Sequence, residues 1–156
     1  MATLRDLRRH LGTLAATLWN HGAAFPVPAL DSYGPDEVGF AFTAELPGVD
    51  GPGSTTIAMA EIWERDGARG FRRREYAYDL VERSLGRRRA FHGHDPEWFA
   101  REFGVLVHEH CEGRLGAPAC PHYYGLPVDA CEALHAFLVA WGQPGPLGCD
   151  RLRCLG

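Results

Sequence analysis

The chain has 156 residues, a length typical of one domain, and a formal net charge of −4. This mild negative charge argues against a protein that coats DNA, because such a protein needs surplus cations to displace counterions. Intrinsic disorder is disfavoured, since 46% of the residues are hydrophobic and 23% are charged. All the basic side chains except histidine are arginines, and six of the eight histidines fall between His92 and His135. The clustered histidines are therefore the main functional signal.

The first element expected in chain order is an amphipathic helix over residues 3–20. Its leucines recur at intervals of three and four residues, and Thr3 is suited to be its N-cap. Segments bounded by turn residues then predict four strands, over residues 37–46, 55–65, 71–82 and 87–91. Because short turns separate these strands, we expect an antiparallel meander.

The second half of the chain is expected to add a short helix, a fifth strand and a long helix. Asp95-Pro96 is typical of a helix start, and this short helix should run through Phe103. A strand should begin at Val105, and the apolar spacing of residues 128–141 predicts the closing helix. The expected fold class is α+β: a curved antiparallel sheet of about five strands, packed by an N-terminal and a C-terminal helix.

The sequence predicts a cytoplasmic protein that is not inserted in a membrane. The charged N-terminus lacks the apolar core of a signal peptide, and no stretch approaches the roughly 20 apolar residues of a membrane span. Five cysteines without an export signal favour reduced thiols. We expect a single domain over residues 1–145, followed by a tail over 146–156 that contains proline, glycine and cysteine.

The strongest chemical signal is a pair of His-x-His motifs at the ends of two predicted strands. They are His92 with His94 and His108 with His110. Residues two apart on a strand share a face, so each pair should point one way while Glu109 points the other way. We expect the two pairs to meet at one rim of the sheet. Because histidine titrates near neutral pH, they can share general-base and general-acid roles, with Glu109 as a further catalytic candidate.

RNA is the substrate that the neighbouring residues favour. In RNA cleavage one imidazole takes the 2′-hydroxyl proton and another protonates the leaving oxygen, without any cofactor. Nearby arginines can hold phosphate, and two tyrosines expected on the strand face of Arg72 and Arg74 offer a stacking surface. The candidate substrate-binding residues are Arg72, Arg74, Arg88, Arg89, Tyr76 and Tyr78. A plainer interpretation of the tyrosines is packing within the sheet.

Zinc is the alternative cofactor, because histidine, cysteine and aspartate are its usual ligand types. The candidate ligands of a catalytic zinc are His92, His94, Asp95, His108, His110 and Cys111. Glu109 or Glu112 would then activate a water molecule. The candidate ligands of a structural zinc are Cys111, Cys120, His122, Cys131 and His135. Cys131 and His135 are also readily explained as ordinary helix residues.

The closing helix is preceded by three notable segments: Arg-Arg-Arg-Glu-Tyr-Ala-Tyr-Asp (72–79), Arg-Arg-Ala-Phe-His-Gly-His-Asp (88–95) and Val-His-Glu-His (107–110). From about Ile57 to Trp141 the chain thereby resembles the TumE-type toxins of bacterial toxin–antitoxin pairs. That family has adjacent histidines where this chain has an intervening glycine. The resemblance implies a small toxin that acts on RNA and is neutralised by a cognate antitoxin. It carries over the histidines of the two motifs, with Arg88 or Arg89 in support.

Three hypotheses follow from the sequence. The leading one is a toxin-like ribonuclease that uses histidine acid–base catalysis. The second is a zinc-dependent hydrolase, or a structural-zinc protein, that uses the same histidines and cysteines. The third is a non-catalytic partner-binding module whose helix at residues 3–20 docks another chain.

Overall fold

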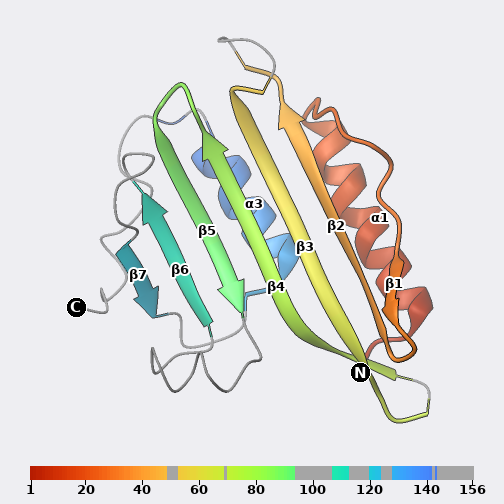
Figure 1. Ribbon diagram of the computed structural model, residues 1–156. Coiled ribbons are helices and arrows are strands. Elements are labelled where there is room, and N and C mark those ends of the chain that lie inside the picture. The colour runs from red at the N-terminus through yellow and green to blue at the C-terminus, as the bar shows by residue number, and fades with distance from the viewer. Residues whose placement is uncertain are drawn as a thin grey trace.

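The computed structural model describes residues 1–48, 53–68, 70–93, 128–141 and 143, together with the backbone of 107–112 and 120–123. Its centre is a seven-stranded antiparallel sheet whose strands follow one another in chain order. Figure 1 shows both described helices behind this sheet. We call the side that they cover the helix face, and the side toward the viewer the front face.

The labels of the elements follow Figure 1. The helices are α1 (Leu4–Asn20) and α3 (Ala130–Ala140). The strands are β1 (Asp31–Gly34), β2 (Glu37–Leu46), β3 (Thr55–Asp66), β4 (Gly70–Glu82), β5 (Arg87–Gly93), β6 (Val107–Glu112) and β7 (Cys120–Tyr123).

Helix α1 packs against the sheet through one apolar stripe. Its buried residues are Leu7, Leu11, Leu14, Ala15 and Leu18. Thr3 caps the helix as predicted: its hydroxyl accepts from the Asp6 backbone N–H, and the Asp6 carboxylate accepts from the Thr3 N–H. The chain leaves α1 through Gly22, whose φ of 75° suits glycine. Local sequence signals therefore define both ends of this helix.

The core lies between the helix face and the two helices. It is built from alternate residues of the central strands and from the inner sides of the helices. Its larger members are Leu11, Leu14, Leu18, Phe40, Phe42, Ile57, Met59, Tyr76, Tyr78, Leu80, Phe91, Leu134 and Phe137. Because successive strand residues alternate between faces, the intervening residues lie on the front face. Among these are Ala58, Ala60, Ala77, Asp79, Ala90 and His92.

A bulge interrupts the pairing of β3 with β4. Ile62 lies opposite Glu75, but the next residue of β3, Trp63, lies opposite Arg73. Arg74 is therefore the extra residue on β4, and the alternation of faces shifts by one at this point. The bulge places Arg73 on the helix face, where its guanidinium lies 4.4 Å from the centre of the Tyr76 ring.

The structure confirms the predicted α+β class with a curved antiparallel sheet. The predicted helices at 3–20 and 128–141 correspond to α1 and α3, and four predicted strands correspond to β2 to β5 with ends displaced by at most two residues. The fifth predicted strand corresponds to β6. The sequence does not predict β1 and β7, because four-residue strands are too short to show a hydrophobic period. The helix expected from Asp95 to Phe103, the strand start at Val105 and the tail at 146–156 lie outside the described residues.

Candidate functional site

Strands β5 and β6, which carry the His-x-His motifs, are direct neighbours in the sheet. In their register His92 lies opposite His108, and Ala90 lies opposite His110. Direct partners in an antiparallel pair lie on the same face, so these three histidines occupy positions on the front face. His94 and Asp95 lie outside the described residues.

Asp79 of β4 lies beside His92 and was not among the residues selected from the sequence. His92 Nε2 is 3.1 Å from Asp79 Oδ2, and Arg88 Nε donates to Asp79 Oδ1 at 2.5 Å. Burial raises the pKa of the Asp79 carboxyl, but the hydrogen bond and charge of His92 and the charge of Arg88 outweigh burial, so the net pKa lies below its ordinary value. The front face therefore presents an ionised carboxylate shared by an imidazole and a guanidinium.

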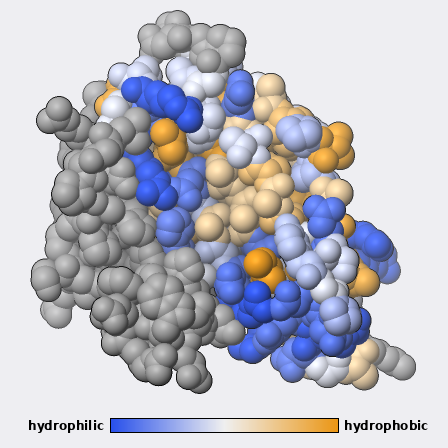
Figure 2. Space-filling model, viewed as in Figure 1, coloured by the Kyte–Doolittle hydropathy of each residue, from blue (hydrophilic) through white to orange (hydrophobic). Residues whose placement is uncertain are grey.

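Small residues adjoin this group on the front face. Ala77 is the direct partner of His92, and Ala60 is the partner of Ala77 on the next strand. Figure 2 shows weakly hydrophobic residues over the middle of this face, with hydrophilic ones beside them. The polar group around Asp79 thus borders an apolar part of the sheet.

The two candidate tyrosines are not on this face, and their predicted role in stacking a substrate is wrong. Tyr76 and Tyr78 are 6% and 0% exposed and belong to the core. The Tyr76 hydroxyl accepts from the Val128 N–H, and the Tyr78 hydroxyl donates to Glu61 at 2.5 Å. Their predicted sharing of a face with Arg72 and Arg74 fails because the bulge brings Arg73 to them instead.

The candidate arginines have different environments. Arg72 forms an ion pair with Glu64, and Arg74 forms one with Glu37, so their charges are already compensated. The Arg89 guanidinium lies 5.1 Å from the centre of the Phe91 ring, which places it on the helix face. Of the four candidates, Arg88 is the one that the structure places beside His92, through their common contact with Asp79.

Glu109 and Cys111 occupy positions on the other face of β6 from the histidines. Glu109 lies opposite Phe91, and Cys111 lies opposite Arg89. The register therefore separates Glu109 from its predicted catalytic partners, and Cys111 from the histidines of the candidate zinc site. On the side of β7, Cys111 lies opposite Cys120, and Glu109 lies opposite His122.

Cys131 and His135, the helical candidates for a structural zinc site, line a groove of about 370 Å³ between α1 and α3. Within the part of the chain that the structure describes, no group of three or more histidine, cysteine, aspartate or glutamate side chains is arranged to hold a metal ion.

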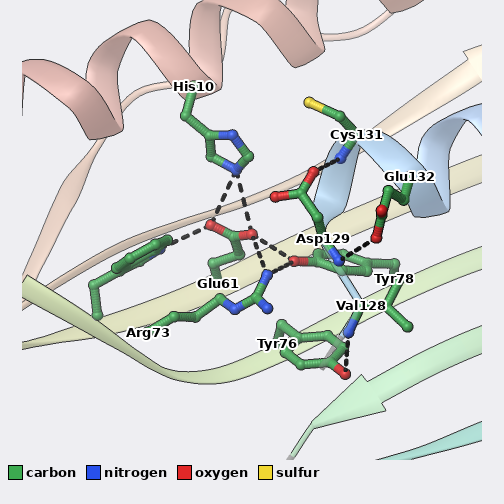
Figure 3. Close-up of polar contacts among 10 residues, drawn as sticks. His10, Glu61, Arg73, Tyr76, Tyr78, Val128, Asp129, Cys131 and Glu132 are labelled. Carbon is green, nitrogen blue, oxygen red and sulfur yellow. Dashed lines mark hydrogen bonds and ion pairs between the residues drawn. The ribbon is translucent and has the colours of Figure 1, made fainter. Parts of the chain in front are cut away.

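A second polar cluster lies buried on the helix face, where Figure 3 shows His10 reaching from α1 toward Glu61 of β3. The Glu61 side chain has no exposed surface. It accepts hydrogen bonds from Tyr78 at 2.5 Å and from the Trp63 indole at 2.8 Å. His10 and Arg73 approach it at 3.3 and 3.4 Å. A buried carboxylate is thus supplied with donors from α1, β3 and β4.

These contacts keep Glu61 ionised. Burial raises its pKa, but the hydrogen bonds from His10, Tyr78 and Trp63 and the charge of His10 outweigh burial, and the net pKa is lowered. The pKa of His10 is raised, chiefly by its hydrogen bond to Glu61. The sequence contains a signal for this cluster: Glu61 has the same strand parity as the core residues Ile57 and Met59, which predicts that it points inward.

Comparison of the chain with protein-family models, curated proteins and solved structures finds no match. Neither of the helices in the described residues is long and apolar enough to cross a membrane.

Proposed function

We propose that this protein cleaves RNA by general acid–base catalysis, using histidines of β5 and β6. The observation that carries the proposal is the register that makes His92 and His108 direct partners, with His110 two residues further along the same face. The Cα atoms of such partners are about 4.5–5.5 Å apart, so two imidazoles can serve one phosphodiester.

In the proposed reaction His92 takes the proton of a ribose 2′-hydroxyl. The 2′-oxygen attacks the adjacent phosphorus, and a P–O2′ bond forms while the P–O5′ bond breaks. A protonated histidine of β6, His108 or His110, gives its proton to the leaving 5′-oxygen. The products are a 2′,3′-cyclic phosphate and a 5′-hydroxyl, and no oxidant, reductant or metal is consumed.

Two further observations support this proposal. Arg88 shares a carboxylate partner with His92, so a guanidinium lies close to where the phosphate would bind. The resemblance to TumE-type toxins implies an RNA-directed toxin with an antitoxin protein as its partner. We extend the proposal accordingly to a cytoplasmic toxin.

The test is cleavage of a short oligoribonucleotide by the purified protein in the presence of a metal chelator. We expect the wild type to produce 2′,3′-cyclic phosphate ends, and a substrate with one 2′-deoxyribose to resist cleavage at that position. His92→Ala, His108→Ala and His110→Ala should each be assayed. Replacing the base or the acid should lower kcat by about 10²–10⁴-fold.

His135→Ala is the matched control, because His135 is exposed on α3, behind the sheet. It should cleave at the wild-type rate. Absence of RNA cleavage by the wild type contradicts the proposal. If the chelator abolishes cleavage and His92→Ala loses about one zinc ion per chain, a zinc-dependent hydrolase replaces it.

A further inference from the structure

Asp79 lies between the two front-face groups that the proposed reaction uses. One carboxylate oxygen faces His92 Nε2 at 3.1 Å, and the other accepts from Arg88 Nε at 2.5 Å. The three residues come from neighbouring strands, β4 and β5, at positions that the sheet register fixes. Their side chains are mostly buried, since Asp79 is 19%, His92 16% and Arg88 28% exposed.

We propose that Asp79 is a positioning residue that fixes the orientation and tautomer of His92. This inference rests on the proposed function and assigns a residue that acts through the general base. A carboxylate next to an imidazole nitrogen keeps the proton on that nitrogen and stabilises the imidazolium that forms when the base accepts a second proton. Asp79 is suited to this role because its pKa is lowered, which keeps it an acceptor at neutral pH.

Arg88 makes this inference sharply testable. A guanidinium only donates hydrogen bonds, so Arg88 dictates which atoms of residue 79 face it. In Asp79→Asn the amide oxygen should turn to Arg88, and the amide NH₂ should then face His92. Nε2 of His92 must accept from that NH₂, so its proton should move to Nδ1. The isosteric substitution thus reverses the tautomer without removing the side chain.

The first measurement is nitrogen-15 NMR of the His92 imidazole in the full-length protein, at a pH where the ring is neutral. We expect the Nε2–H tautomer in the wild type and the Nδ1–H tautomer in Asp79→Asn. The second measurement is RNA cleavage by the same variants. Asp79→Asn should lower kcat by about 10²-fold with KM within about twofold, because Asp79 acts on the base. Asp79→Glu, which keeps the charge, should restore part of kcat.

Asp36→Asn is the matched control, because Asp36 also accepts from an arginine, Arg65 Nε, at 2.9 Å. It should leave the His92 tautomer and kcat unchanged. An unchanged tautomer in Asp79→Asn overturns the inference. A reversed tautomer with wild-type kcat overturns the role of Asp79 as a positioning residue for catalysis, while the proposed function stands. If the wild type cleaves no RNA, the proposed function fails and the catalytic role of Asp79 fails with it, whatever the tautomer.

Discussion

Four side chains converge on the carboxylate of Glu61: His10, Trp63, Arg73 and Tyr78. Among the residues that the structure describes, His10 is the only histidine in contact with this carboxylate. A carboxylate taken out of water is costly unless its oxygens are hydrogen-bonded and its charge is balanced. Here Tyr78 and Trp63 supply hydrogen bonds, while Arg73 and protonated His10 supply positive charge. The cluster therefore couples the seating of α1 on the sheet to the protonation of one imidazole.

The stabilising contribution of His10 should depend on pH. Its pKa in the folded protein is above the ordinary value of 6.5, so the contribution is fully present below about pH 6.5 and is lost as the pH rises through the folded value. Glu61 has the opposite sign: its pKa lies below the ordinary 4.5, so its contribution is present above that pH and is lost in stronger acid. Both stabilising contributions are therefore present together between about pH 5 and 6.

Urea unfolding of wild type and His10→Gln at about pH 5.5 and pH 8 measures this dependence. The difference in free energy of unfolding between the two proteins should be larger at the lower pH. His21→Gln is the comparison: the change between the two conditions should be larger for His10→Gln, because His10 contacts Glu61 whereas His21 contacts the Thr17 carbonyl. An equal difference at both pH values for His10→Gln would contradict the predicted coupling.

The polar residues of the front face were only partly visible in the sequence. The His-x-His spacing places His108 and His110 on a common face once a strand is assumed, but only the pairing of β5 with β6 places His92 on that face too. Asp79 carries no comparable signal, because a single acidic residue in a strand is usually solvated. Its significance depends on Arg88 and His92, which follow it by 9 and 13 residues and meet it only when β4 pairs with β5.

At the scale of elements, α1 is the one most fully specified by local sequence. Its leucine spacing and its N-cap agree with each other, and the helix forms where they predict it. Thr3→Ala should lower the free energy of unfolding by about 1 kcal/mol, because the Asp6 N–H loses its acceptor. Thermal and urea unfolding of the purified variant would measure this loss.

Thr13→Ala serves as the comparison within the same helix. Thr13 is exposed and its hydroxyl bonds to the Arg9 carbonyl, a group that the helix already uses. Alanine has the higher helix propensity, so this variant should be as stable as the wild type or slightly more stable. If both threonine variants lose equal stability, the cap is not the cause.

Strand β4 shows where element-scale prediction fails. Its limits are predicted to within one residue, but its alternation is not, because Arg74 forms a bulge opposite β3. A bulge requires no distinctive residue here, and it becomes evident only in the pairing with the neighbouring strand. That single insertion explains why Arg73, rather than Arg72 or Arg74, accompanies the tyrosines.

At the scale of the whole molecule, the proposed ribonuclease should arrest growth when it is expressed in bacteria without an antitoxin. Loss of bulk RNA should accompany the arrest, since the proposed reaction attacks the phosphodiester backbone. His92→Ala should relieve the arrest at equal protein level, whereas His135→Ala should not. Harmless expression of the wild type, with intact RNA, would contradict a toxin function.

The sequence by itself determined the α+β class, both described helices and five of the seven strands, because these depend on hydrophobic period, caps and turns within short segments. The tertiary structure alone decided which side chains meet. Strand pairing aligned His92 with His108, brought Asp79 to His92 and Arg88, and divided the histidines from Glu109 and Cys111 between two faces. Packing of α1 brought His10 to Glu61 across 51 residues. Such contacts follow from register and docking, which no local pattern encodes.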